Sequence, residues 1–178
     1  MLDIYMSNIL KTPAESYTEM NEIVLPNDTN ILNNLMGGRL LHWMDICAAI
    51  AARKHCNRSV VTASVDSVSF TEPIHLGDVV TIKAQVSRAF KSSMEIHLEV
   101  FADNIQTGKM RKSNEAYYTF VAVDGYGNAI QVPEIKPVTE DDKKRFDGAL
   151  RRRQLRLILG GKMKPEDANE LRSLFIRD

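Results

Sequence analysis

The residue with the clearest chemical interest is Asp45, which lies inside an apolar, helix-forming segment, residues 39–55. That segment contains many strong helix formers and neither glycine nor proline. A carboxylate among apolar residues is costly to bury without partners, and such groups cluster at functional sites. His42 lies three residues earlier, on a similar face of the same helix. The alternative is that Asp45 reaches solvent or an ion pair, and that His42 is an ordinary surface or packing residue.

A second candidate is the segment that leads into this helix, residues 33–38, which ends in Gly37 and Gly38. Glycine lets the backbone approach a ligand closely. The free N–H groups and the positive dipole end of a helix start favour a developing negative charge, which is what an oxyanion hole requires. A simple loop remains the alternative, because two glycines before a helix are common.

Other catalytic or metal-binding motifs are missing from the sequence. It has no GxSxG motif and no glycine-rich phosphate loop. The histidines and cysteines show no metal-ligand spacing, so we expect no metal site. These residues are His42, His55, His75, His97, Cys47 and Cys56. With two cysteines a disulfide framework is not expected, and Cys47 is expected to be a small core residue.

The elements that must position these residues form a regular pattern. The helix over 39–55 is apolar on most faces, so we expect it to be buried. Alternating and β-branched segments predict strands at residues 17–24, 59–70, 79–90, 92–102 and 111–123. One strand, a helix and four meandering antiparallel strands predict an α+β fold, in which a curved antiparallel sheet wraps around a long central helix. A helix over 139–156, opened by a capping box, and a short one over 165–175 follow.

Charge is distributed unevenly along the 178 residues, although 23 bases balance 23 acids. Residues 1–133 carry 11 bases and 14 acids, whereas residues 134–178 carry 12 bases and 9 acids. Within the second part, residues 143–164 hold nine bases and one acid. We therefore divide the chain into a domain over 12–133 and a basic, helical C-terminal tail over 134–178. The basic run is either a solvated helix face or an anion site.

The composition also excludes several classes of protein. No apolar run approaches the roughly 18 residues of a membrane span, so no membrane partner is expected. The first residues have no basic cluster and no clean apolar core, so we identify no signal peptide and expect a cytoplasmic protein. A net charge of zero argues against nucleic acid as a main partner.

Several short motifs resemble those of a known family when they are taken together and in order. They are Val24-Leu25-Pro26, Asp28, Asn30, the run from Asn34 to Gly38, Trp43-Met44-Asp45 and Gly77-Asp78-Val79. This set resembles the hotdog-fold acyl-CoA thioesterases, and most closely the acyl-CoA hydrolases of the cytosolic and brown-fat type with their bacterial relatives. The resemblance runs from about Thr12 to Arg156, and the family's fold agrees with the sheet and helix predicted above.

The resemblance implies that the chain hydrolyses acyl-CoA to a fatty acid and free CoA. Asp45 matches the carboxylate that acts as base on the attacking water, and Asn34 matches an asparagine that works with it. Backbone N–H groups near Gly37 and Gly38 would hold the thioester oxygen. No cofactor is implied, since CoA is part of the substrate and product. A thioester needs an activated water and an oxyanion site, but neither a metal nor a strong acid.

The resemblance also implies where CoA binds and how the chain assembles. Lys91, Ser92 and Ser93 stand at a hairpin position that touches the nucleotide end of CoA in relatives, and Arg111 and Asn114 are further candidates. The basic tail could reach a phosphate of CoA or form contacts within an oligomer. Family active sites lie between two protomers, which implies a dimer at least and, in many members, a hexamer built as a trimer of dimers.

Two other functions stay open from the sequence. One is a regulator that binds acyl-CoA without hydrolysing it, although too few residues precede the first predicted strand for a DNA-binding helix-turn-helix. The other is a hotdog hydratase or dehydratase, a chemistry that uses a catalytic histidine, for which His42 is the candidate.

Overall fold

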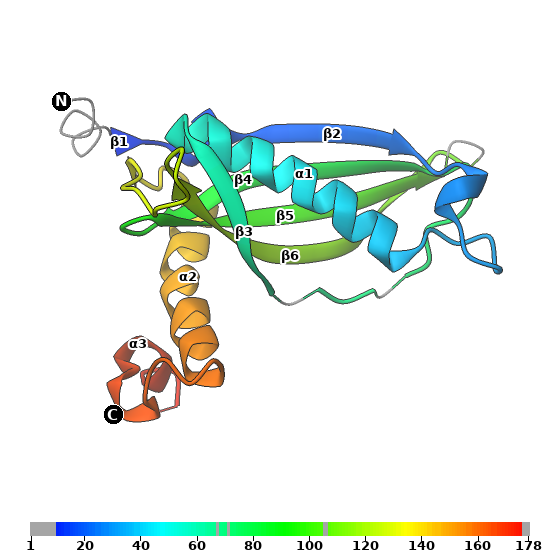
Figure 1. Cartoon of the computed structure of the whole chain (residues 1–178). Coiled ribbons are helices and arrows are strands. Elements are labelled where there is room, and N and C mark those ends of the chain that lie inside the picture. Colours follow the sequence, from blue (N-terminus) through cyan, green and yellow to red (C-terminus); the bar gives the residue numbers. More distant parts are fainter. Residues whose placement is uncertain (1–9, 67, 71, 105–106, 176–178) are drawn as a thin grey trace. The chain divides into compact units, whose positions relative to one another are not determined.

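A computed structural model describes residues 10–66, 68–70, 72–104 and 107–175 of the chain. The chain divides into two compact units, Met1–Lys136 and Pro137–Asp178. The first unit holds the sheet and the long helix, and the second is helical (Figure 1). Within the described residues, no helix combines the length and the apolar composition that crossing a membrane requires.

The first unit is built on one five-stranded antiparallel sheet in the order β2-β4-β5-β6-β3. Its strands are β2 (Thr18–Ile23), β3 (Ser59–Asp66), β4 (Val79–Ala89), β5 (Ser93–Asn104) and β6 (Lys109–Val123). The predicted antiparallel sheet around one helix is therefore confirmed. The prediction that all four strands after the helix form one meander is wrong, because β3 pairs with β6 at the edge of the sheet. Short turns join β4, β5 and β6, whereas the longer connection after β3 lets that strand lie apart from β4.

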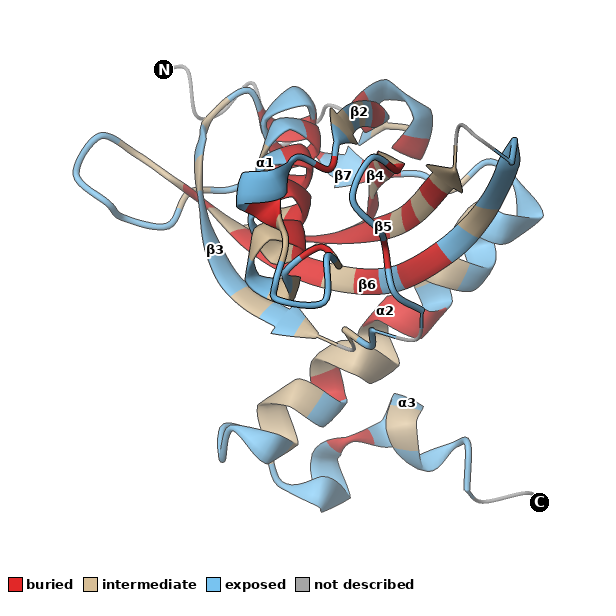
Figure 2. Ribbon diagram, turned by 90° about the vertical axis from the view of Figure 1, so that its right-hand side faces the viewer, coloured by how far each residue is buried: buried red, intermediate tan, exposed pale blue. Residues whose placement is uncertain are grey.

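Helix α1 (Gly37–Cys56) crosses one face of this sheet (Figure 1). It begins two residues before the predicted segment, with Met36 as its N-cap, and is followed by the C-cap Asn57, whose φ of 52° is left-handed. Figure 2 shows that its buried residues gather on the side facing the sheet. They pack against the alternating apolar side chains of the strands, which supply most of the stability of such a layered fold.

Cys47 lies in this core, as the sequence predicted. It is fully buried on α1, and burial raises the pKa of its thiol to about 12. Such a thiol stays protonated near neutral pH and has little nucleophilic character. Cys47 therefore contributes packing and not chemistry.

Short elements complete the first unit. Strand β1 (Leu10–Lys11) pairs in parallel with β7 (Glu134–Ile135), a pairing the sequence analysis did not predict. Single 3-10 turns form at Pro13–Ser16 and Pro26–Asp28. In the second of these turns, Asp28 accepts a hydrogen bond from the backbone N–H of Leu25 at 3.1 Å and pairs with Arg39 at 2.8 Å. This turn thus anchors the loop that leads into α1.

The second unit consists of α2 (Glu140–Leu159) followed by a 3-10 turn (Pro165–Asp167) and α3 (Asn169–Arg172). The predicted final helix over 165–175 is therefore broken into two shorter pieces. The backbone N–H of Leu171 donates to Oε1 of Gln154 at 2.9 Å, which ties α3 to α2. The basic side chains predicted for the tail lie on α2 and in the turn that follows it.

The capping box at the start of α2 gives a first testable prediction. The hydroxyl of Thr139 accepts from the N–H of Asp142 at 3.0 Å, and the Asp142 carboxylate accepts from the N–H of Thr139 at 2.9 Å. Thr139→Ala removes one of these bonds and is expected to lower the free energy of unfolding by about 1 kcal/mol. Urea unfolding followed by circular dichroism measures this loss. Thr139→Ser keeps the cap and should stay close to wild type, and equal losses in the two variants would contradict the assignment.

Candidate functional site

Asp45 lies near the middle of α1, with its side chain half-buried. The hydroxyl of Thr62 on β3 donates a hydrogen bond to Oδ1 of Asp45 at 2.8 Å. Thr62 lies on β3, the edge strand that follows α1 in the chain and pairs with β6. One oxygen of the carboxylate is thus fixed by a neutral donor, and within the described residues the other oxygen makes no hydrogen bond.

Tyr118 of β6 lies in the same layer between sheet and helix. It is 1% exposed, and its hydroxyl has no hydrogen-bond partner among the described residues. Burial raises the pKa of Tyr118 to about 12, and the negative charge of Asp45 adds to this effect. The hydroxyl therefore stays protonated at neutral pH. Asp45 is thus bonded to the exposed Thr62 and acts electrostatically on the buried Tyr118.

The loop before α1 is held by two asparagines. Oδ1 of Asn30 accepts from the backbone N–H groups of Leu32 at 2.9 Å and Asn34 at 3.3 Å. Oδ1 of Asn34 lies 2.7 Å from Nδ1 of His75, which requires the protonated form of that nitrogen as donor. These contacts order the loop and leave the side-chain NH₂ groups of both asparagines available as donors in this part of the structure.

Gly37 and Gly38 form the first turn of α1. Within the described residues, neither N–H group makes a hydrogen bond, as expected for the first residues of a helix. A Cβ atom on Gly37 would come within 3.1 Å of the ring of Phe70, so a larger residue here would require that exposed ring to shift by a few tenths of an ångström. The space around Gly38 is open. The two N–H groups are therefore free to donate to an anionic oxygen, which is the role the sequence suggested for them.

A cavity of about 340 Å³ adjoins this turn. Leu35, Leu40, Phe70 and Ile74 provide apolar walls, and Asn34, Gly37 and Asn114 also line it. The side chain of Asn114 is itself held, because its amide donates to the carbonyl of Ser69 and accepts from the hydroxyl of Ser113. The structure thus brings three of the predicted site residues around one apolar cavity, whereas Asp45 does not line it.

Lys91 and Ser92 lie in the turn between β4 and β5, and Ser93 is the first residue of β5. The carbonyl of Ser92 accepts from the N–H of Ala122 at 2.9 Å, which places this hairpin at the end of the sheet where α1 ends. The 20 residues of α1 correspond to roughly 30 Å, so the hairpin lies far from Gly37 and Gly38 of the same chain. A single chain therefore does not bring all the predicted residues together.

Arg111 has contacts that the sequence did not reveal. Its guanidinium donates to the carbonyl of Pro73 at 2.7 Å and to the buried carboxylate of Asp78 at 3.1 Å, and it also approaches Glu72 at 3.4 Å. These bonds fix the connection between β3 and β4. In a single chain, Arg111 is therefore committed to holding this loop.

One cluster of the described residues has the donor types of a metal site, namely His97, Glu99 and Glu115. The ammonium of Lys112 lies 2.7 Å from both Glu99 and Glu115, and His97 lies 2.8 Å from Glu115. A lysine thus already supplies a positive charge between the two carboxylates. We interpret the cluster as an ion-pair network on the sheet.

Comparison with known proteins shows relatives that match most of this chain. The family model described as "Thioesterase superfamily" matches residues 32–109. An uncharacterized acyl-CoA thioester hydrolase of Bacillus subtilis, YkhA, is 36% identical over 138 residues, which cover 75% of this chain and 80% of that protein. The human cytosolic acyl coenzyme A thioester hydrolase is 35% identical over 138 residues, covering 76% of this chain but 36% of that longer protein.

Solved structures of acyl-CoA hydrolases also resemble this chain in sequence and in fold. An acyl-CoA hydrolase from Staphylococcus aureus, solved with butyryl coenzyme A, coenzyme A and coenzyme A disulfide, is 38% identical and superimposes with a TM-score of 0.79. The match covers 86% of this chain and 95% of that one. A hexameric acyl-CoA thioesterase superimposes with a TM-score of 0.83 at 36% identity, covering 85% and 97% of the two chains.

Proposed function

Because this chain belongs to the hotdog-fold acyl-CoA thioester hydrolases of the thioesterase superfamily, we propose that it releases CoA and a fatty acid from acyl-CoA with Asp45 as general base. The observation that carries this proposal is the hydrogen bond from Thr62 to Asp45. It orients the carboxylate and leaves its second oxygen available for a water molecule. General bases act through this kind of directed contact.

Asp45 and the N–H groups at the start of α1 can together carry out hydrolysis of the thioester. The free oxygen of Asp45 takes a proton from water as the water oxygen bonds to the thioester carbonyl carbon. The carbonyl oxygen becomes an oxyanion, which the N–H groups of Gly37 and Gly38 stabilise. Collapse of the tetrahedral intermediate breaks the C–S bond and releases CoA as a thiolate. A thiolate leaves without a strong acid, because the pKa of a thiol is about 8.5.

The length of α1 requires two chains for one site. Gly38 and Asp45 are seven residues apart, which corresponds to about 10 Å along the helix. One thioester carbonyl cannot contact both groups in the same chain. We infer that the glycine turn of one copy faces Asp45 of another, so that the protein works at least as a dimer. The hexameric state of a relative supports a larger assembly, which we propose to be a trimer of dimers.

The spacing of three residues that were replaced in a relative points to Asn30 as a further candidate for the active site. Solved structures of the Staphylococcus aureus enzyme include alanine variants of an asparagine, an aspartate and a threonine at positions 28, 43 and 60. The intervals of 15 and 17 residues equal those between Asn30, Asp45 and Thr62 (45 − 30 and 62 − 45). This supports Asp45 and Thr62, and it favours Asn30 as the asparagine that works on the water or carbonyl. We assign Asn34 to the wall of the apolar cavity.

The two asparagines can be separated by kinetics. Asn30→Ala is expected to lower kcat about 100-fold, because it removes a donor to the reacting groups. Asn34→Ala is expected to raise KM and to leave kcat within a few-fold, because Asn34 lines the cavity and bonds to His75 but does not contact the reacting groups in this proposal. Steady-state assays of free thiol release with each variant measure both constants. A large fall in kcat for Asn34→Ala together with a nearly unchanged kcat for Asn30→Ala would instead assign the catalytic role to Asn34.

A panel of acyl-CoAs from acetyl to palmitoyl tests the function itself, with thiol release as the readout. We expect saturable hydrolysis of at least one chain length and no requirement for an added metal or cofactor. Binding without turnover across the whole panel would instead favour the regulator. Turnover of enoyl-CoA above that of saturated acyl-CoA would favour a hydratase, but His42 is exposed and has no hydrogen-bond partner among the described residues. We expect a cytoplasmic protein.

A further inference from the structure

The two sides of the glycine turn at the start of α1 differ. Gly37 lines the cavity of about 340 Å³, a volume within the range of small-molecule sites, and Gly38 does not line it. No atom of the described residues lies within 4 Å of a Cβ built on Gly38. A thioester whose oxygen binds these N–H groups therefore meets a walled side at Gly37 and an open side at Gly38.

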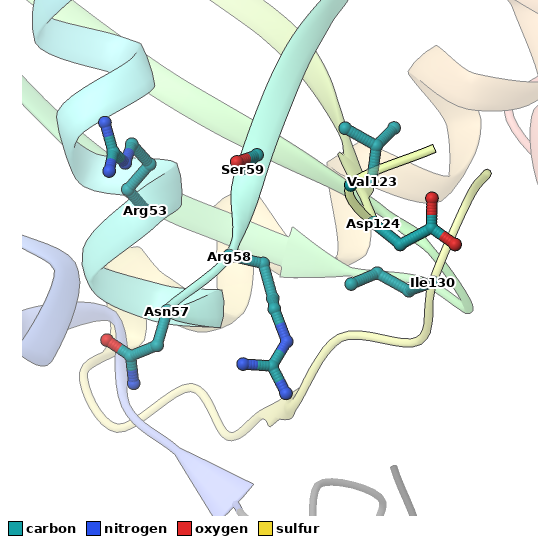
Figure 3. Close-up of a pocket in the computed structure, with 8 residues that line it drawn as sticks. Arg53, Asn57, Arg58, Ser59, Val123, Asp124 and Ile130 are labelled. Atoms are coloured by element: carbon teal, nitrogen blue, oxygen red, sulfur yellow. The ribbon is translucent and has the colours of Figure 1, made fainter. Parts of the chain in front are cut away.

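The walled side suits the acyl group of the substrate. The cavity has apolar walls, of which Leu40 and Ile74 are buried. A larger pocket at the other end of α1 is lined by Arg53 and Arg58 (Figure 3). A hydrocarbon chain there would separate charged guanidinium groups from water, which is costly. We therefore assign the acyl group to the cavity at Gly37, with the sulfur of CoA on the open side.

Phe70 is the wall residue that lies nearest to the glycine turn. A Cβ built on Gly37 would lie 3.1 Å from Cζ of Phe70 and within 3.5 Å of both its Cε atoms. Cα–Cβ bonds tilt toward the N-terminus of a helix, which is also the end at which the free N–H groups bind an anion. The ring edge thus borders the place of the thioester carbonyl. Because Phe70 is 55% exposed, packing in the core does not explain its position.

The backbone on both sides of Phe70 is held by strand β6. The side-chain amide of Asn114 donates to the carbonyl of Ser69, and Asn114 is buried. The guanidinium of Arg111 donates to the carbonyl of Pro73 at 2.7 Å. A wall held in this way can discriminate by shape, since a bulkier group must displace it at a cost in free energy.

We propose that Phe70 is a specificity-determining residue, which favours straight acyl chains over chains branched at the carbon next to the thioester carbonyl. A methyl branch at that carbon meets the edge of the ring, whereas an unbranched chain continues into the cavity along Leu40 and Ile74. The preferred substrates are then CoA thioesters of straight-chain acids. This assignment rests on the proposed function, because it takes the thioester oxygen to bind the N–H groups of Gly37 and Gly38.

Butyryl-CoA and isobutyryl-CoA test the proposal, because their acyl groups are isomers that differ only in the branch. In wild type, kcat/KM for butyryl-CoA is expected to exceed that for isobutyryl-CoA at least about tenfold, the effect of one badly accommodated methyl group. In Phe70→Ala this ratio should fall to about threefold or less, through a rise in kcat/KM for isobutyryl-CoA. Phe70→Leu should lie between the two. Phe175→Ala, which removes an exposed ring from the second unit, is the control and should keep the wild-type ratio.

The assignment is wrong if wild type shows no preference for butyryl-CoA, or if Phe70→Ala keeps the wild-type ratio. An equal loss with both substrates in Phe70→Ala would also contradict it, because that result indicates a packing role. Thermal unfolding of Phe70→Ala should match wild type, since the side chain is exposed. If wild type hydrolyses no acyl-CoA, the proposed function fails, and calorimetric titration with the same two acyl-CoAs then decides whether Phe70 discriminates between them in binding.

Discussion

Replacing Asp45 with asparagine is expected to lower kcat for acyl-CoA hydrolysis about a thousandfold and to leave KM nearly unchanged. The amide has the shape of the carboxylate and can still accept the bond from Thr62, which is 2.8 Å long in the native protein. It cannot take a proton from water. The variant therefore removes the base and preserves the geometry around it, which makes it sharper than truncation to alanine.

The control for this variant is Asp141→Asn, which removes the same charge from an exposed position in the first turn of α2. It should keep wild-type kinetics. Thermal unfolding and the oligomeric state of the Asp45 variant should match those of wild type. A loss of less than about tenfold would show that Asp45 is not the base, since general bases contribute about 100-fold or more.

The second large effect is expected at Thr62. Thr62→Val keeps the shape and β-branching of the side chain but removes the donor to Asp45. The carboxylate then loses the bond that fixes its orientation, and a misplacement of about 1 Å can cost a factor of 100. We expect kcat to fall between about tenfold and 100-fold with little change in thermal stability, because Thr62 is exposed.

Thr62→Ser provides the matching control, because serine retains the hydroxyl. It should recover most of the wild-type kcat in the same thiol-release assay. If serine and valine are equally impaired, the hydroxyl is not responsible and the role of Thr62 is packing alone. This comparison separates orientation of the base from any structural effect of the threonine methyl group.

Asp45 could be identified from the sequence because a carboxylate within an apolar helix is a local anomaly. The helix and the strands were predicted for a similar reason, since hydrophobic periodicity is a local signal. Helix α1 matches its predicted segment within two residues at its start. The glycine turn at Gly37 and Gly38 also follows from local chain properties.

Thr62 could not be found in this way. In the sequence it is one β-branched residue among several in an alternating strand. It reaches Asp45 only because β3 pairs with β6 instead of its sequence neighbour β4, which is a long-range choice. Tyr118 could not be found from the sequence either. Only the folded structure shows that its hydroxyl is buried without a hydrogen-bond partner among the described residues.

The proposed division of the site between two chains also has a physical reason. A straight helix of 20 residues separates its own first turn from Asp45 and from the hairpin of Lys91 beyond its other end. No pattern in one sequence states which copy completes which site. The resemblance to the family suggested this arrangement, and the helix length now provides a reason for it.

The most direct test of Asp45 as a general base is single-turnover hydrolysis in water enriched in ¹⁸O, with enzyme in excess over acyl-CoA. If Asp45 activates water, the fatty acid carries one solvent oxygen from the first turnover, and Asp45 stays unlabelled when its peptide is analysed by mass spectrometry. If the first fatty acid is unlabelled and ¹⁸O appears in Asp45, the carboxylate attacks the thioester itself and the account given for the reaction is wrong.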